Sequence, residues 1–260
     1  GYRALKLDAL IGIGGDSSLG ILNKLAKKGK FNLVCIPKTI DNDVGVTEIS
    51  VGYDTAVQVA TDALDMLQPT AASHDRVMIL EVMGRDAGHI ALVAGIAGGA
   101  DVILIPEIPY RIEHVLRKIK SIREAGRRFA LIVVAEAVPN ESGNKVIQKY
   151  AGGRSAYGGI GHLLGDRVSE TTQAEVRVTV LGHVQRGAAP NARDRLMASV
   201  FGVHAIDLIA AGRLGRVVVW RDRQVLDLPI EDVVIEPALV ELEGPIVRTA
   251  RGLGICLGDA

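Results

Sequence analysis

Short apolar runs alternate with stretches of helical periodicity along most of the chain. Apolar runs predict strands at residues 9–13, 31–36, 77–82, 101–105, 129–135 and 176–181. Helical spacing predicts helices that begin after Ser18 and at about 53–67, 88–97, 112–126, 161–170 and 192–211. We expect Pro69 to end the second of these helices. Strands that alternate with helices indicate crossover units, so the predicted fold class is α/β with parallel sheets.

The remaining segments show weaker patterns. Residues 1–8 are typical of a helix end or a linker, and residues 139–159, rich in Gly, Ser and Asn, predict a long loop. Runs at 217–220 and 225–228 are separated by a polar turn and predict a hairpin. The tail from Glu236 shows no pattern that predicts an element.

Composition narrows the class of protein. The 260 residues carry a formal net charge of zero, which gives no electrostatic reason to expect a nucleic-acid or membrane partner. The most apolar stretch, residues 90–105, is interrupted by Gly98, Gly99 and Asp101, so it predicts a helix, a turn and a strand rather than a membrane span. Cys35 and Cys256 have no metal-site spacing. We therefore expect an intracellular, cytoplasmic enzyme with free thiols.

An acidic loop follows the second predicted strand, with the sequence Pro37-Lys38-Thr39-Ile40-Asp41-Asn42-Asp43. Because residues i and i+2 of an extended backbone share a face, Asp41 and Asp43 are expected to point the same way, with Thr39 alongside and Asn42 turned aside. Two carboxylates and a hydroxyl suit chemistry on an alcohol: one carboxylate accepts the proton, and the other binds a metal or orients the first. Taken alone, the loop is more typical of Asp and Asn residues that cap turns.

A glycine turn follows the first predicted strand, with the sequence Gly14-Gly15-Asp16-Ser17-Ser18-Leu19-Gly20. Glycines let backbone N–H groups approach an anion, and the start of a helix adds partial positive charge, so the turn predicts a phosphate site. Asp16 has no Lys or Arg beside it in the turn, which favours binding Mg²⁺.

Polar residues follow four of the later strands, at the sheet edge where ligands gather in open α/β sheets. They are Arg85, Glu107, Glu136 and the pair His183 and Arg186, and Arg177 lies at the beginning of the last of these strands. Arginines at such positions suit a dianionic phosphate. Each residue alone is also compatible with a purely structural ion pair.

Four motifs occur in order and together resemble the 6-phosphofructokinase family over essentially the whole chain. They are Gly14-Gly15-Asp16, the acidic loop 37–43, Met83-Gly84-Arg85 and Leu181-Gly182-His183-Val184-Gln185-Arg186-Gly187. The match is most similar to bacterial, ATP-dependent members with Lys in P-K-T-I-D-N-D. The resemblance implies a glycolytic kinase that transfers a phosphoryl group from ATP to the 1-hydroxyl of fructose 6-phosphate and gives fructose 1,6-bisphosphate. A lipid or nicotinamide kinase, which also uses G-G-D turns, is disfavoured by M-G-R and the Arg-rich second half.

The resemblance also implies roles for individual residues. Asp41 matches the catalytic base, Thr39 and Asp43 its supporting residues, and Arg85 an arginine that steadies charge on the transferred group. The sugar-phosphate site is implied to contain Met83, Gly84, Arg85, Glu136, His183 and Arg186. Arg76 and Arg177 match arginines that reach the sugar phosphate of a neighbouring subunit, which implies a homo-oligomer, dimeric or tetrameric. The donor site is implied to contain Gly15, Asp16, Ser17, Ser18, Gly20 and Lys38, with Mg²⁺ on Asp16.

Position 17 bears on the choice of donor. The family has glycine there in ATP users and aspartate in pyrophosphate users, whereas this chain has Ser17. Serine is small and uncharged, so we expect ATP, with pyrophosphate as the alternative donor. A positive φ at Ser17 would strain the turn by about 1 kcal/mol.

The family pattern implies two lobes, each a mainly parallel sheet flanked by helices, with the site between them. We expect a donor lobe from residues 1–52 and 185–235 and a sugar-phosphate lobe from residues 53–184 and 236–260. The opening strand and glycine loop of the family have no counterpart in this sequence. We therefore expect an N-terminally truncated member with weak turnover alone, and a non-catalytic subunit that only binds sugar phosphate stays open as the second hypothesis.

Overall fold

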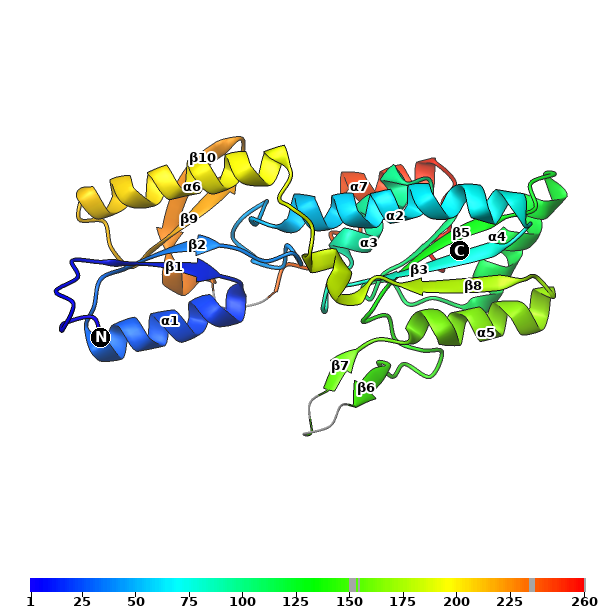
Figure 1. Cartoon of the computed structure of the whole chain (residues 1–260), viewed down its shortest axis with the longest axis horizontal. Helices are drawn as coiled ribbons and strands as arrows, with labels where there is room; N and C mark the ends of the chain where they lie inside the picture. The colour runs from blue at the N-terminus through cyan, green and yellow to red at the C-terminus, as the bar shows by residue number, and fades with distance from the viewer. Residues whose placement is uncertain (150–152, 154, 234–236, 260) are drawn as a thin grey trace. The chain divides into compact units, whose positions relative to one another are not determined.

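The computed structural model describes residues 1–149, 153, 155–233 and 237–259 (Figure 1). The chain divides into two compact units. The first consists of Gly1–Thr55 and Ala189–Ala238, and the second of Ala56–Ala188 and Leu239–Ala260. Each unit is therefore built from two separate stretches of the chain.

The first unit is a sheet with a helix on each face. Its strands β1 (Leu10–Gly14), β2 (Leu33–Pro37), β9 (Arg216–Arg221) and β10 (Gln224–Pro229) lie in that order, parallel except for the antiparallel β9–β10 hairpin. Helix α1 (Asp16–Gly29) and helix α6 (Ala192–Ala210) lie on opposite sides of the sheet in Figure 1. A short 3-10 helix, η2 (Ile230–Val233), follows β10.

The alternation of side chains along β2 explains this two-sided core. Leu33 and Cys35 pack in the cluster that contains Leu19 of α1. Val34 and Ile36 pack with Phe201 of α6. Since successive strand residues point to opposite faces, a wholly apolar strand needs a covering layer on both sides.

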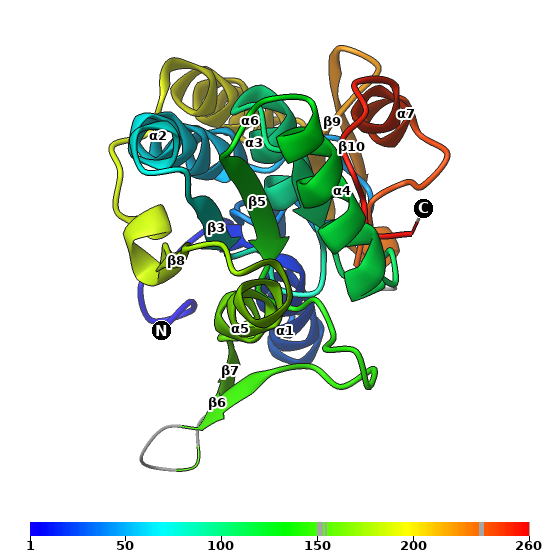
Figure 2. The same ribbon diagram turned by 90° about the vertical axis from the view of Figure 1, so that its right-hand side faces the viewer.

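The second unit is built around a parallel sheet with strand order β4-β5-β3-β8. These strands are β3 (Val77–Val82), β4 (Val102–Leu104), β5 (Ala130–Ala135) and β8 (Val176–Val180). The helices are α3 (His89–Ala97), α4 (Ile112–Glu124), α5 (Ile160–Thr172), α7 (Pro245–Gly252), the 3-10 helix η1 (Gly182–Arg186) and most of α2 (Tyr53–Ser73). Helix α5 packs on β3 and β8 beside α4, whereas α3 packs on β4 and β5, and Figure 2 shows α3 and α5 on opposite sides of the sheet.

Most of the predicted elements are confirmed, including the α/β class, the parallel sheets and the hairpin, which corresponds to β9 and β10. The prediction that Pro69 ends a helix is wrong, because α2 continues to Ser73. Proline removes one helical N–H, but Ala71 beyond it is fully buried and packs against Met78 and Leu131. Tertiary packing thus holds the last turn in place.

A short hairpin of two strands and one short helix were not predicted. The segment 139–159, expected to be a loop, contains the antiparallel strands β6 (Ile147–Lys149) and β7 (Ser155–Tyr157), although residues 150–152 and 154 lie outside the described part. Ile147 is half exposed and Ser155 and Ala156 are exposed, so no apolar run marks these strands. Helix α7 is only eight residues long and starts with Pro245, which leaves too few apolar positions for a pattern.

Within the described part of the chain, no helix combines the length and hydropathy that a membrane span requires.

A buried carboxylate holds the start of α2. The Asp194 side chain, on α6, accepts hydrogen bonds from the backbone N–H groups of Gly52 (2.7 Å) and Thr55 (2.8 Å) and from the Thr55 hydroxyl. Its own N–H donates to the Asn191 side chain, which caps α6 (2.9 Å). Because the first N–H groups of a helix have no intrahelical partner, Asp194 satisfies groups that would otherwise be lost on burial.

We expect Asp194→Ala to lower the free energy of unfolding by about 3 kcal/mol, since two backbone N–H groups lose a buried acceptor. Urea denaturation measures the difference. The matched control is Asp207→Ala on the same helix, at an exposed position, which should change stability by less than about 0.5 kcal/mol. Equal effects of the two substitutions would contradict the capping role.

Candidate functional site

The glycine turn and the acidic loop lie at the same edge of the first unit. Strands β1 and β2 are parallel neighbours with Gly14 opposite Pro37, so the segments that follow them leave the sheet together. The Lys38 N–H donates a hydrogen bond to the Gly14 carbonyl at 2.9 Å. The structure therefore brings the two motifs together, as their order along the chain suggested.

Close packing requires one glycine of the turn and places a second against the acidic loop. A Cβ atom on Gly14 would lie 2.6 Å from the Ser18 Cβ, which is a clash. A Cβ atom on Gly15 would lie 3.4 Å from the Thr39 Cβ, so the turn is in contact with the acidic loop. Gly20 lies buried in α1 one turn further on. The glycine turn thus packs directly against the acidic loop.

Thr39 holds Asp41 by two hydrogen bonds. The Thr39 hydroxyl donates to Asp41 Oδ2 (3.2 Å), and the Asp41 N–H donates to Thr39 Oγ1 (3.2 Å). Asp41 and Asp43 are both buried, at 7% and 4% exposed. A carboxylate held this way has a fixed orientation, which suits a group that must accept a proton at a defined point.

Asn42 fixes the acidic loop from the side. Its backbone is left-handed, with φ of 54°. Its side chain donates to the Glu48 carbonyl (3.1 Å) and accepts from the Ser50 N–H (2.9 Å). The Asn42 side chain therefore points into its own loop, but the left-handed backbone is not the extended segment on which the prediction for Asp41 and Asp43 rested.

Ser17 lies in the first turn of α1, next to Asp16, and its hydroxyl donates to Asp16 Oδ1 at 3.2 Å. The helix includes Ser17, and the residue has no positive φ. The strain considered for a serine at this position therefore does not arise. Asp16, at the start of the helix, carries the charge that the helix macrodipole favours there.

In the second unit, the loop between β3 and α3 receives a side chain from each of the three other strands of the sheet. The Met83 N–H donates to Gln185 Oε1 (2.9 Å), the Arg85 N–H to Glu136 Oε1 (3.0 Å) and the Gly88 N–H to Glu107 Oε1 (2.9 Å). Glu107 follows β4, Glu136 follows β5 and Gln185 follows β8. The carboxyl ends of all four strands therefore converge on this loop.

These contacts gather most of the predicted sugar-phosphate residues. Met83, Gly84 and Arg85 are in the loop, Glu136 binds it, and Arg186 Nε lies 3.4 Å from the Met83 sulfur. His183 and Arg186 are exposed on η1.

Arg76 and Arg177 lie apart from this group, at the opposite end of β3 and β8. Arg76 forms an ion pair with Glu175 (2.8 Å), and Arg177 pairs with the same carboxylate. The hydrogen bond from Arg76 lowers the pKa of Glu175, and the charge of Arg177 adds to this effect. The structure therefore brings these two arginines together with each other, but not with Arg186.

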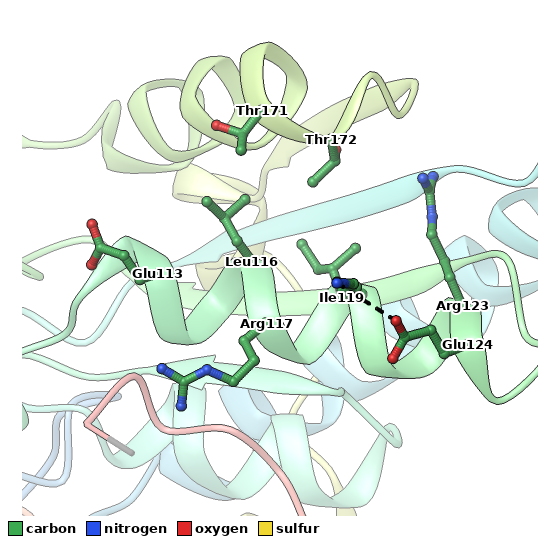
Figure 3. Close-up of a pocket in the computed structure, with 9 residues that line it drawn as sticks. Glu113, Leu116, Arg117, Ile119, Arg123, Glu124, Thr171 and Thr172 are labelled. Carbon is green, nitrogen blue, oxygen red and sulfur yellow. Dashed lines mark ion pairs between the residues drawn. The ribbon is translucent and has the colours of Figure 1, made fainter.

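A separate pocket of about 670 Å³ lies between α4 and α5 (Figure 3). Leu116 and Ile119 of α4 point toward Thr171 and Thr172 of α5, and Lys120 pairs with Glu124 at the rim. None of the predicted site residues lines it. It is distinct from the loop at the strand ends.

Among the described residues, no group of three or more His, Cys, Asp or Glu side chains is arranged to hold a metal ion. Mg²⁺ commonly binds through one or two carboxylates together with substrate phosphates and water, which a single Asp16 fits.

Comparison with known proteins places these motifs in a family. The phosphofructokinase family model matches residues 1–209 of this chain. The chain belongs to the phosphofructokinase family. The glycine turn, the acidic loop, the loop after β3 and η1 all lie within the matched part.

Two relatives that share one name match the whole chain. The protein named ATP-dependent 6-phosphofructokinase 1 of Synechocystis sp. is 60% identical over 259 residues, which are 100% of this chain and 72% of that protein. The protein of the same name in Nostoc sp. is 57% identical, with the same coverage. Among solved structures, the pyrophosphate-dependent phosphofructokinase of Nitrosospira multiformis has a TM-score of 0.81 over 99% of this chain and 70% of that chain, at 20% identity. A likeness at that identity concerns the fold alone.

Some structural partners of the phosphofructokinase motifs were missed in the sequence. Gln185 lies between His183 and Arg186 in the motif 181–187 and is 1% exposed, but the sequence did not indicate that it binds the loop after β3. No signal in the sequence marks Gln185 as the inward residue, because the apolar Val184 beside it is 71% exposed.

We expect Gln185→Leu to lower the free energy of unfolding by about 2 kcal/mol, because the Met83 N–H loses its acceptor. Gln58→Leu on α2 is the matched control, since it removes an exposed hydrogen bond to Asp62 (2.7 Å) and should cost at most about 0.5 kcal/mol. Chemical denaturation of both variants compares them. If Gln185→Leu is as stable as the control, the bond to Met83 does not hold the loop.

Proposed function

We propose that this chain transfers a phosphoryl group from ATP to the 1-hydroxyl of fructose 6-phosphate and forms fructose 1,6-bisphosphate. The observation that carries the proposal is the buried Asp41, held by Thr39 next to the glycine turn. The high identity to two proteins named ATP-dependent 6-phosphofructokinase supports both the reaction and the donor.

In this proposal Asp41 accepts the proton of the 1-hydroxyl as its oxygen attacks the phosphoryl group. Thr39 orients the carboxylate through the hydroxyl bond to Oδ2. Asp43, buried two residues further on, is the supporting carboxylate. That Asp41 and Asp43 face the same way stays a prediction.

The proposed donor site is the start of α1 and its preceding turn. Backbone N–H groups at a helix start bind phosphate oxygens, and the glycines let these oxygens approach. We assign Gly15, Asp16, Ser17, Ser18, Gly20 and Lys38 to this site. Asp16 would hold Mg²⁺, which neutralises charge on the phosphates when bound.

The proposed sugar-phosphate site is the loop after β3 with the residues around it. Arg186 and His183 are exposed and able to reach a phosphate, whereas Glu136 fixes the backbone at Arg85. We assign Met83, Gly84, Arg85, Glu136, His183 and Arg186 to this site. Arg85 would steady negative charge on the transferred group.

We propose a separate role for each of the two lobes. We assign donor binding to residues 1–52 with 185–235, and sugar-phosphate binding to residues 53–184 with 236–260 together with Arg186, which belongs to the second compact unit. The donor motifs lie in the first compact unit and the sugar-phosphate motifs in the second, which supports this division.

Self-association is a further part of the proposal. Arg76 and Arg177 converge on one carboxylate, Glu175, and lie far along the strands from Arg186. A sugar phosphate bound to a neighbouring copy could replace Glu175 as the anion that both arginines bind.

We also propose a cytoplasmic location. Both cysteines are free thiols, which supports this location.

Asp41→Asn should lower kcat by about a thousandfold, because general base catalysis is lost while the shape of the side chain is kept. KM for fructose 6-phosphate should change little. Steady-state assays with Mg-ATP measure both constants, and Asp207→Asn on the exposed face of α6 is the control, with unchanged kcat. Retention of normal kcat by Asp41→Asn would exclude it as the base.

Ser17 should decide between the two donors. We expect Ser17→Asp to weaken turnover with ATP, because a second carboxylate beside Asp16 repels the nucleotide phosphates. Ser17→Gly should keep ATP as the donor and lose about 0.5 kcal/mol of stability through lower helix propensity. Assays of each variant with ATP and with pyrophosphate give the answer. Higher turnover of the wild-type chain with pyrophosphate than with ATP would refute ATP as the donor. Binding of fructose 6-phosphate in calorimetry, without turnover with either donor, would favour the non-catalytic subunit.

A further inference from the structure

Asp86, the residue after Arg85, is held by two side chains that flank the β6–β7 hairpin. The Tyr157 hydroxyl donates to Asp86 Oδ1 at 2.8 Å, and the Lys145 ammonium pairs with the same oxygen. Lys145 also donates to the Tyr157 hydroxyl (3.2 Å) and lies 4.8 Å from the centre of the Tyr157 ring. The three side chains therefore form a closed triangle, which we call the Asp86 triangle.

The backbone next to this triangle has an unfavourable conformation. Arg85 has φ of 54°, a left-handed value that costs a residue with a Cβ about 1 kcal/mol. Gly84 before it has φ of 153°, and a Cβ there would lie 2.6 Å from the Ala87 carbonyl oxygen. A backbone of this kind persists only where its surroundings hold it.

Two anchors flank Arg85 and determine where its side chain starts. On one side, its own N–H donates to Glu136 Oε1 (3.0 Å). On the other side, the next side chain, Asp86, belongs to the triangle. Glu136 follows a strand of the sheet, but Lys145 and Tyr157 come from the hairpin segment.

The hairpin itself is anchored to the strand that leads into the loop. Glu81 of β3 is 2% exposed and accepts hydrogen bonds from the N–H groups of Gly159 (3.0 Å) and Gly161 (2.8 Å), just after β7. Ile147 pairs with Tyr157 across the hairpin. Figure 1 shows β6 and β7 beyond α5, away from the parallel sheet of their unit. A ring of contacts thus runs from β3 through the Arg85 loop and the Asp86 triangle back to Glu81.

The triangle keeps its charges in balance. Burial alone would raise the pKa of Asp86, but the hydrogen bonds from Lys145 and Tyr157 lower it. Burial alone would lower the pKa of Lys145, but its bond to Asp86 raises it. A carboxylate and an ammonium that both stay charged add no net charge beside Arg85.

We propose that Asp86, Lys145 and Tyr157 are positioning residues that fix the left-handed backbone at Arg85 and so set the starting position of its side chain, whose proposed role is to steady charge on the transferred phosphoryl group. The role of Arg85 in this inference rests on the proposed function, whereas the fixing of the loop does not. An interaction that serves only the transition state changes kcat and leaves KM nearly unaltered.

The test uses Tyr157→Phe and Lys145→Met in the full chain. Amide hydrogen exchange of residues 83–88 should become about tenfold faster in both variants, because the loop opens more often. Their kcat should fall about tenfold, with KM for fructose 6-phosphate within twofold of the parent. Lys145→Arg keeps the charge and the donor and should restore most of both properties.

Matched controls remove the same groups elsewhere. Tyr2→Phe deletes a tyrosine hydroxyl that donates to the Asp8 carbonyl (2.7 Å), and Lys120→Met deletes a lysine paired with Glu124 (3.7 Å). Neither control should alter exchange in residues 83–88 or kcat. In an Arg85→Ala background, Tyr157→Phe should cause no further loss of kcat, since the side chain that it positions is gone.

Unchanged exchange at residues 83–88 in both variants would overturn the inference, whatever the activity. An additional loss of kcat from Tyr157→Phe in the Arg85→Ala background would overturn the route through Arg85. A parent chain without turnover would contradict the proposed function only, because the exchange measurement still decides whether the triangle holds the loop.

Discussion

Backbone N–H groups in the loops that follow the strands need hydrogen-bond acceptors, and this need determines how these loops are held. Each loop that leaves a strand exposes such groups, and a buried N–H without an acceptor is costly. Glu107, Glu136 and Gln185 supply acceptors to the loop after β3. Glu81 and Asp194 do the same for the starts of α5 and α2. Side-chain oxygens thus take the place of a backbone ladder.

This arrangement ties chemistry to packing. A carboxylate that accepts hydrogen bonds from two N–H groups has a fixed orientation. The loop that it holds then packs as part of the core. In the first unit the same result is reached differently, by the contact of Gly15 with Thr39 and by the hydroxyl of Thr39 on Asp41. Both units therefore present polar groups from loops with little freedom to rearrange.

The sequence pattern predicted what depends on apolar periodicity. Strand β3 was predicted to the residue, because all of Val77–Val82 is buried and a continuous run is then unambiguous. The neighbouring position of the glycine turn and the acidic loop followed from the parallel order of two strands. Gln185 and the β6–β7 hairpin could not be found this way, since their stability comes from single hydrogen bonds between residues far apart in sequence. The end of α2 was predicted too early, at Pro69, because the burial of Ala71 cannot be deduced from local helix propensity.

The left-handed backbone of Arg85 places stability in opposition to the catalytic role proposed for this residue. Glycine is the residue that this φ favours, so Arg85→Gly would relieve local strain while it removes the guanidinium. Selection for stability alone would therefore discard the arginine. A screen that enriches more stable variants of this protein without an activity criterion is expected to lose Arg85 early, whereas selection for the proposed activity is expected to keep it.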